Sequence, residues 1–181
     1  YQQNTMRDAM VAALSLNIFH KYTERLKMTN IAQIANVLQS MVLTRGDKMV
    51  LTPTYHVFRM YNVHQDALYL PSVCDAAKFT DGNGRQCPYV DATASRNAEG
   101  AIHVTLTNVS LDEAATVTID LAGNVKPRIT GEILTAETIQ TYNDFDRPDE
   151  VKPVEFKDFK VKDGKIVVKM PAKSIVSLSI L

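Results

Sequence analysis

The sequence predicts a mixed fold in two parts: a short α/β segment typical of the end of a βα barrel, over residues 1–65, and an all-β, jelly-roll-like sandwich over residues 66–181. Apolar side chains recur every four residues near the start, which is the stripe of a helix that packs against a partner: Met6, Met10, Leu14, Ile18 and Tyr22. From residue 67 onward, short alternating strands are separated by turn residues, as in a sandwich. Because a helix-strand-helix piece of this length cannot close a core alone, we expect residues 1–65 to be the last unit of a larger barrel.

The composition is that of a soluble globular protein, with 45% hydrophobic and 22% charged residues. Twenty basic and twenty acidic side chains cancel, so we expect neither a nucleic-acid partner nor a polybasic surface that binds membranes. The sequence has no run of ~18 apolar residues, which argues against a membrane-spanning helix. The cellular compartment stays open.

The first helix has a clear beginning. Asn4 or Thr5 can serve as its N-cap, and Asp8 lies three residues after Thr5, where a capping box needs an acid. The predicted helix ends between Lys21 and Leu26, where basic residues suit the negative end of the helix dipole.

Residues 28–38 are ambiguous. Periodicity favours a helix, since four apolar residues match its spacing: Ile31, Ile34, Ala35 and Leu38. A buried barrel strand is the competing interpretation. The residues that follow predict a β-hairpin that turns at Arg45-Gly46-Asp47.

A second helix is predicted to begin at Thr52-Pro53, with a hydroxyl at the N-cap and proline at the first helical position. Its apolar face would hold Tyr55, Phe58 and Tyr61, and it would end near His64. Alternating patterns then predict strands around residues 102–106, 117–121, 129–133, 166–168 and 175–180. Turn residues separate them at Asn97–Gly100, Gly123-Asn124 and Asp163-Gly164.

Four stretches of the chain stand out, in the order NTMRDAMVAALSLNIF, KMTNIAQIANVLQSMVLT, KMVLTPTYHVFRMYNVHQ and NDFDRPDEVKPVEF. Together they resemble one family, the α-L-arabinofuranosidases of glycoside hydrolase family 51. The last stretch is similar to the Asn-x-Phe-x-x-Pro-x-x-Val-x-Pro segment in the terminal sandwich of those enzymes. The resemblance covers nearly the whole chain.

The resemblance implies an eight-stranded βα barrel followed by a sandwich. In that frame, residues 3–27 resemble the helix after the seventh strand, residues 28–36 the eighth strand, and residues 53–64 the closing helix. Family members remove terminal α-L-arabinofuranosyl units from arabinan and arabinoxylan with retention, using two glutamates and neither a metal nor an organic cofactor.

The family's two glutamates end the fourth and seventh barrel strands, and both positions lie upstream of Tyr1. The nucleophile's Glu-Trp motif is absent, and the sequence contains no tryptophan. We therefore expect no catalytic residue in this chain. Its expected partners are the remainder of the catalytic barrel and, in the whole enzyme, an arabinose-containing polysaccharide or oligosaccharide.

Three residues are candidates for sugar contact in the whole enzyme: Asn36, Thr52 and Tyr55. The resemblance puts Thr52 where some members carry a sugar-binding glutamine, although a threonine before Pro53 is also explained as a helix cap. Asn36 could orient groups at the barrel mouth or be a buried polar residue bonded to backbone. No metal site is expected, because the four histidines lack zinc-site spacing. Cys74 and Cys87 flank a polar loop and could form a disulfide or stay as two thiols.

Two other functions stay open. In a stand-alone carbohydrate-binding module, Phe79, Tyr89 and Tyr142 would be the candidates for stacking on sugar, although packing is the favoured role for them without tryptophan. In a protein-interaction module, the unpartnered face of the first helix would bind another chain. For the chain alone, that face predicts a homo-oligomer or a helix docked on the sandwich.

Overall fold

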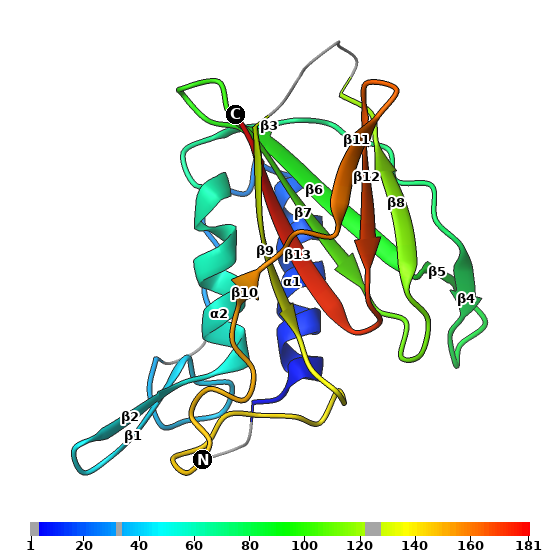
Figure 1. Ribbon diagram of the computed structural model, residues 1–181. Helices are drawn as coiled ribbons and strands as arrows, with labels where there is room; N and C mark the ends of the chain where they lie inside the picture. The colour runs from blue at the N-terminus through cyan, green and yellow to red at the C-terminus, as the bar shows by residue number, and fades with distance from the viewer. Residues whose placement is uncertain (1–3, 32–33, 122–127) are drawn as a thin grey trace.

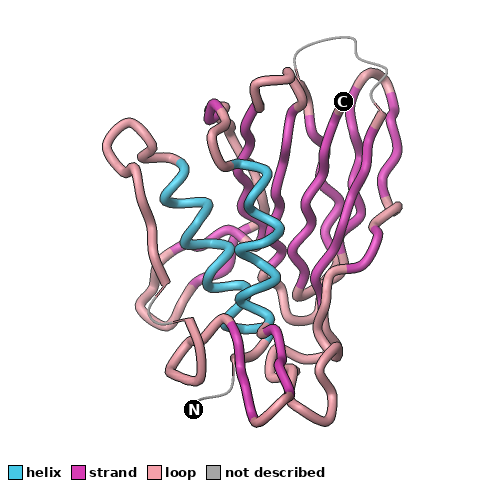
Figure 2. The backbone as a smooth tube through the Cα atoms, turned by 90° about the vertical axis from the view of Figure 1, so that its left-hand side faces the viewer, coloured by secondary structure: helices cyan, strands magenta, loops and turns pink. Residues whose placement is uncertain are grey.

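The computed structural model describes residues 4–31, 34–121 and 128–181, and these residues form three layers (Figure 1). Helices α1 (Met6–His20) and α2 (Pro53–Tyr61) lie on one face of a six-stranded sheet, and a three-stranded sheet covers part of the other face. Figure 2 shows the two helices side by side against the sheet. A 3-10 turn, η1 (Asn62–His64), continues α2.

The six-stranded sheet is antiparallel throughout, in the order β10-β9-β13-β7-β6-β3. The smaller sheet has the order β11-β12-β8, and two hairpins, β1-β2 and β4-β5, stand outside both sheets. The strands are β1 (Val42–Arg45), β2 (Lys48–Leu51), β3 (Leu68–Tyr69), β4 (Lys78–Thr80), β5 (Gln86–Pro88), β6 (Val90–Arg96), β7 (Ile102–Asn108), β8 (Ala115–Ile119), β9 (Ile129–Thr135), β10 (Val154–Glu155), β11 (Phe159–Lys162), β12 (Lys165–Met170) and β13 (Ser174–Ile180).

The two faces of the larger sheet belong to two different cores, since successive side chains of a strand point to opposite faces. Between the two sheets, apolar side chains of β13, β7 and β12 interdigitate: Val176, Leu178, Ile180, Val104, Leu106, Ile166, Val168 and Met170. Burial of each large aliphatic side chain stabilises the fold by about 1.5–3 kcal/mol. This core holds the sandwich together.

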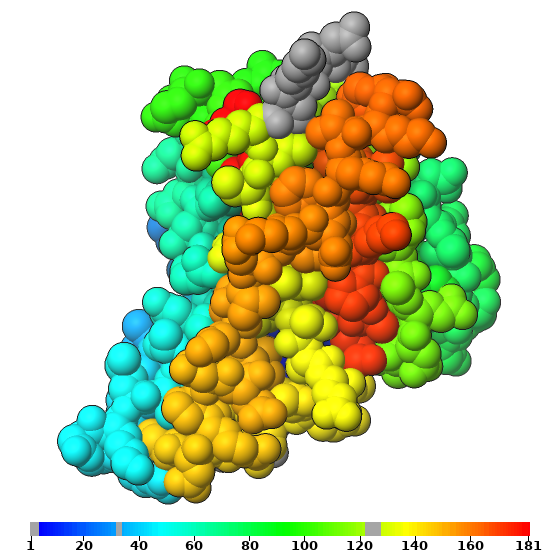
Figure 3. Space-filling model, viewed as in Figure 1, coloured from blue at the N-terminus to red at the C-terminus, as the bar shows by residue number. Residues whose placement is uncertain are grey.

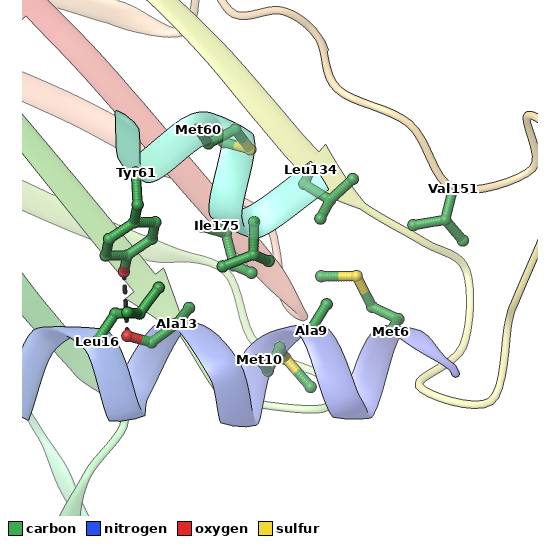
Figure 4. Packing of buried hydrophobic residues seen from close by; sticks show 11 residues of the cluster. Met6, Ala9, Met10, Ala13, Leu16, Met60, Tyr61, Leu134, Val151 and Ile175 are labelled. Carbon is green, nitrogen blue, oxygen red and sulfur yellow. Dashed lines mark hydrogen bonds between the residues drawn. The ribbon is translucent and has the colours of Figure 1, made fainter. Parts of the chain in front are cut away.

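The second core lies between the larger sheet and the helices. In Figure 4, side chains of α1 and α2 converge on Ile175 of β13 and Leu134 of β9, while Val151 closes one end. Ala9 and Ala13 are fully buried, and their small side chains allow α1 to approach closely. Of the two outcomes expected for the first helix, the structure shows its docking on the sandwich, and the homo-oligomer stays a prediction.

Several local predictions are confirmed. Thr5 caps α1 in a capping box, with the Thr5 backbone N–H donating to Asp8 Oδ2 at 2.8 Å. The hairpin turns between Arg45 and Lys48, and α2 starts at Thr52-Pro53. The strands predicted around 102–106, 117–121, 129–133, 166–168 and 175–180 correspond to β7, β8, β9, β12 and β13. The turn predicted at Gly123-Asn124 lies outside the described residues.

The helix that periodicity favours at residues 28–38 is wrong, and the described residues there form no strand either. Ala35 makes only an isolated parallel bridge to Val42. The backbone of Asn36 and Gln39 is left-handed, with φ of 58° and 60°, which neither a regular helix nor a strand tolerates. Ile34 and Leu38 are 74% and 61% exposed, so the apolar spacing reflects no packing within this chain.

The buried faces of both helices also differ from the predicted stripes. On α1, Met6 and Met10 are buried, but Ile18 is half exposed and Tyr22 lies beyond the helix end. The buried residues of α1 are Met6, Ala9, Met10, Ala13, Leu16 and Asn17, which follow the i, i+3, i+4, i+7 spacing of a helix face. On α2, Tyr55 and Phe58 are only half buried, and the face against the sheet holds Val57, Met60 and Tyr61.

Gly131 tests how tightly the sandwich packs. A Cβ at this position of β9 would lie 2.8 Å from Leu178 Cδ2 and 3.0 Å from the Phe156 carbonyl oxygen. We therefore expect Gly131→Ala to lower the free energy of unfolding by about 1–3 kcal/mol through overpacking, as measured by urea denaturation. Gly82→Ala is the control, because nothing lies within 4 Å of its Cβ position. Equal stability of the two variants would contradict this packing.

Candidate functional site: the junction of the helical segment with the sandwich

Thr52 is a buried helix cap. It is 1% exposed, and its hydroxyl donates to the Ser40 carbonyl oxygen at 2.9 Å. The same oxygen accepts from the Tyr55 backbone N–H at 3.3 Å, which is the usual N-cap bond. The Thr52 hydroxyl is thus engaged within the chain. Tyr55 is half buried, with its ring edge-on to His56 at 5.6 Å between centroids.

Asn36 is an exposed residue that fixes a loop. Its Oδ1 accepts from the Thr44 backbone N–H at 2.8 Å, and its Nδ2 donates to Thr44 Oγ1 at 2.7 Å. Asparagine is among the residues that tolerate the left-handed backbone found here. Thr52 and Tyr55 therefore share the start of α2, while Asn36 anchors the preceding loop to β1.

The Asn-x-Phe-x-x-Pro-x-x-Val-x-Pro stretch joins the helical segment to the sandwich. The Asn143 side-chain amide donates to the carbonyl oxygens of Leu51 (2.9 Å) and Val151 (2.8 Å). Its Oδ1 accepts from the Val151 backbone N–H at 2.7 Å. The guanidinium of Arg45 lies 4.3 Å from the Phe145 ring centroid, a cation–π contact. In Figure 3 this segment lies directly against the β1-β2 hairpin.

The start of α1 is fixed by the same region. The Met6 backbone N–H donates to the Thr141 carbonyl oxygen at 2.9 Å, and Thr5 forms a β-bridge with Tyr142. Asn4, which is buried, accepts at Oδ1 from the Thr54 hydroxyl at 2.7 Å. The loop that follows β9 thus holds the beginnings of both helices and the hairpin in one place.

A polar contact joins the last turn of α1 to the sheet. The Tyr61 hydroxyl donates to Asn17 Oδ1 at 2.7 Å, and the Asn17 amide donates to Asp91 Oδ2 at 3.2 Å. Burial raises the pKa of Tyr61, so the phenol keeps its proton and stays a donor. Lys21 pairs with Asp91 at 3.2 Å.

His56 is a buried titratable group at the junction. In the described part of the chain neither of its ring nitrogens has a hydrogen-bond partner. Burial, and then the positive charge of Arg59, lowers the pKa of His56 to about 4. The imidazole is therefore neutral at pH 7.

The candidate sugar-stacking aromatics pack on other side chains. Phe79 and Tyr89 lie 4.9 Å apart between ring centroids, and the Arg147 guanidinium lies over the Tyr142 ring at 5.6 Å. Beside β8, a groove of about 810 Å³ opens between the two sheets, and its lining combines aliphatic residues such as Leu70, Val104 and Leu106 with polar ones such as Arg96 and Glu113. Cys74 and Cys87 are free thiols in the structure.

Within residues 4–31, 34–121 and 128–181, no three histidine, cysteine or acidic side chains gather closely enough to hold a metal ion. Neither of the helices in these ranges has the length and apolar character needed to cross a membrane.

A family model for the α-L-arabinofuranosidase C-terminal domain matches residues 1–174, so this chain belongs to that family. It is 56% identical over 180 residues to an intracellular exo-α-L-arabinofuranosidase of Bacteroides ovatus, covering 99% of this chain and 35% of the relative. The chain thus spans about a third of the length of the curated relative that it matches.

Solved structures show the same fold. The family 51 arabinofuranosidase of Xanthomonas axonopodis pv. citri superposes with a TM-score of 0.93 at 45% identity, over 99% of this chain and 36% of that one. An arabinose complex of the Thermotoga maritima α-L-arabinofuranosidase superposes with a TM-score of 0.87 at 19% identity, over 99% of this chain and 39% of that one. The second likeness concerns the fold alone.

The role of Asn143 could have been found from the sequence but was missed. Asparagine between β-rich segments, followed by an acidic and proline-rich loop, indicates side-chain bonding to backbone. What the pattern could not reveal is that one of its acceptors, Leu51, lies ninety-two residues earlier in the chain.

We expect Asn143→Ala to lower the free energy of unfolding by about 2–3 kcal/mol, because it leaves the buried Val151 N–H without its acceptor and the Leu51 carbonyl without its donor. Urea denaturation followed by circular dichroism measures this loss. Asn83→Ala is the control, since Asn83 lies in an exposed turn. A loss below 0.5 kcal/mol at Asn143, roughly the size of a surface substitution, would show that the junction does not depend on this amide.

Proposed function

We propose that this chain is the C-terminal part of a retaining α-L-arabinofuranosidase that removes terminal α-L-arabinofuranosyl residues from arabinan or arabinoxylan. The family match over residues 1–174 carries this proposal, together with 56% identity to a relative of which the chain covers about a third. Retention needs two carboxyl groups ~5–5.5 Å apart, one as acid/base and one as nucleophile. Both would lie in the part of the enzyme that precedes this chain.

The carboxylates crowded in the loop before β10 have a different role in this proposal. Asp144 accepts from the backbone N–H groups of Asp146 (3.0 Å) and Arg147 (2.8 Å), and Asp149 pairs with Lys152 at 3.1 Å. These bonds shape the loop that carries Asn143 and Val151. The loop acids would therefore be structural, not catalytic.

The direct role of this chain would be to close the barrel and support it, with residues 1–65 as its last unit and residues 66–181 as the accessory sandwich. Exposed apolar side chains support this role. Away from the sheet, the surface of the first segment carries Val11, Ile18, Tyr22, Met28, Ile34, Leu38 and Met49, each 49% to 74% exposed. A monomer rarely leaves so many large apolar groups in water.

The segment around residue 35 would take part in the same closure. Residues 28–36 would be the eighth strand of the whole enzyme, where neighbouring strands would bond to it on both sides. In the described part of this segment, Ala35 forms an isolated parallel bridge with Val42. In the absence of the barrel, the same apolar surface would drive self-association.

Sugar contacts at Asn36, Thr52 and Tyr55 would belong to the whole enzyme. The Thr52 hydroxyl already bonds to Ser40 and caps α2, so its part would be to orient Tyr55. The half-buried Tyr55 phenol is then the better placed of the two for a substrate hydroxyl.

The activity test compares this chain with the same chain extended upstream to include the rest of the barrel. We expect only the extended chain to hydrolyse p-nitrophenyl α-L-arabinofuranoside. Glu150→Gln in the extended chain should keep full activity, because Glu150 is an exposed loop residue. Hydrolysis by the short chain, or a loss of activity in Glu150→Gln, would contradict the assignment of catalysis to upstream glutamates.

A stability test addresses the barrel contact. Ile18→Asp should cost about 2–4 kcal/mol in the extended chain, where the barrel would bury residue 18, and under 1 kcal/mol in the short chain, where Ile18 is half exposed. Denaturant unfolding of both chains measures the difference. Val161→Asp is a matched control, because Val161 is equally exposed but lies on β11 of the sandwich. Equal costs of Ile18→Asp in both chains would refute the contact.

A further inference from the structure

Three histidines form a row beneath the end of α1, on the helix-facing side of the larger sheet. The ring centroids of His20 and His64 lie 5.1 Å apart, and those of His64 and His103 lie 6.5 Å apart. The three residues come from three elements, α1, η1 and β7. His64 and His103 are buried, with 8% and 7% exposure.

Each of the three rings is hydrogen-bonded to at least one hydroxyl group of the larger sheet. His64 is bonded at Nδ1 to Ser95 (2.7 Å) and at Nε2 to Thr105 (2.8 Å). His20 Nδ1 bonds to Thr93 at 3.0 Å, and His103 Nδ1 bonds to Ser179 at 2.9 Å. A hydroxyl can donate as well as accept, so this lining satisfies a neutral imidazole fully. It offers no negative charge to an imidazolium.

The charged groups around the row are few. On β6, Asp91 is held by Lys21 and Asn17. The negative charge of Glu99, in the loop after β6, acts to raise the pKa of His103. Among the three histidines, His103 is the one that it affects. Tyr61 of α2 is protonated and therefore uncharged. From β13, the residue that bonds to the row is Ser179, a partner of His103 that carries no charge. No carboxylate among the described residues thus bonds any of the three rings.

We propose that the His20–His64–His103 row is a pH-sensitive latch: while neutral, it fastens the C-terminal end of α1 and the η1 turn to the sheet, and its protonation releases them. Two imidazolium rings 5–6.5 Å apart in a buried contact repel each other and lose the desolvated hydroxyl bonds. The helix core meets the row at Tyr61, whose ring centroid lies 5.9 Å from that of His20 and 5.6 Å from that of His64. Met6 and Ala9 lie at the other end of α1, so we expect the release to be confined to the end of the helix nearest the row.

The direction of the pH effect follows from linkage. Burial, and then the charges of His20 and His103, lowers the pKa of His64 to about 3, and burial also lowers the pKa of His20 and of His103. The open form binds protons near the ordinary histidine pKa of about 6.5, so the closed form is fully favoured above that pH and loses its advantage as pH falls. From pH 7.5 to 5.0, His64 alone should raise the opening equilibrium roughly thirtyfold.

Hydrogen exchange tests the latch, with rates corrected for the intrinsic effect of pH. For the amides of residues 16–20 and 62–64, the opening equilibrium should increase between pH 7.5 and 5.0. For the β12 amides, it should stay unchanged. His64→Gln, which keeps a neutral donor and acceptor, should reduce the increase about tenfold or more. His56→Gln is the matched control and should leave the increase at residues 16–20 intact.

Two results would overturn the proposal. One is that the opening equilibrium of residues 16–20 and 62–64 increases as much in His64→Gln as in the unmodified chain. The other is that the β12 amides show the same increase. If His64→Gln does not fold, an NMR titration of the unmodified chain decides. The latch requires His64 to stay neutral at pH 5.5 while the protein is folded, and titration of its ring near pH 6.5 with the fold intact would refute it.

Discussion

The larger sheet carries an apolar core on each of its two faces, and the rest of the structure depends on this. β13 lies at its centre, paired with β7 on one side and β9 on the other over its whole length. Its even-numbered residues pack against β12, and Ile175 packs against the helices. A change on either face is therefore transmitted to the strand that both cores share.

The helix-facing surface of the sheet is divided into an apolar part and a polar part. Near the start of α1, Leu134 and Ile175 of the sheet pack against methionine and alanine side chains of the helix in an apolar contact. Toward the end of α1, the strands β6 and β7 present the hydroxyls of Thr93, Ser95 and Thr105, which bond to His20 and His64 of the helical segment. The apolar part supplies most of the stabilisation, whereas the polar part fixes the position of α1, since each buried hydroxyl needs a partner.

Features set by local chemistry could be predicted from the sequence. The Thr5 capping box, the Thr52-Pro53 start of α2 and the turn before Lys48 depend on neighbours within a few residues. The alternating pattern also predicted β7, β8, β9, β12 and β13 correctly, but not the β6 strand between residues 90 and 96. It could not tell where their polar faces lie: Thr93, Thr105 and Ser177 have the spacing of a solvated face but are buried under α1 and α2. Only the tertiary arrangement covers them.

The segment at residues 28–38 could not be predicted for a different reason. Its apolar spacing fits a helix, but Asn36 and Gln39 have left-handed backbone and Ile34 faces water. The resemblance to family 51 implies a strand over residues 28–36, whereas the described residues of that range form only the isolated bridge from Ala35 to Val42. Among the candidate sugar contacts, the sequence correctly offered the capping role of Thr52, but not the bonds of Asn36 to Thr44, because Thr44 lies in a hairpin that follows the loop.

The central claim is that the helices and the sandwich form one folded unit through the shared sheet. Native-state hydrogen exchange at pH 7.5, followed along a series of denaturant concentrations, tests it most directly. Amides in the first half of α1, such as those of Met10 and Ala13, should open in the same cooperative step and with the same free energy as those of β13. If α1 instead opened at a far lower free energy while β13 stayed protected, the helices would be an appendage, and the account would be wrong.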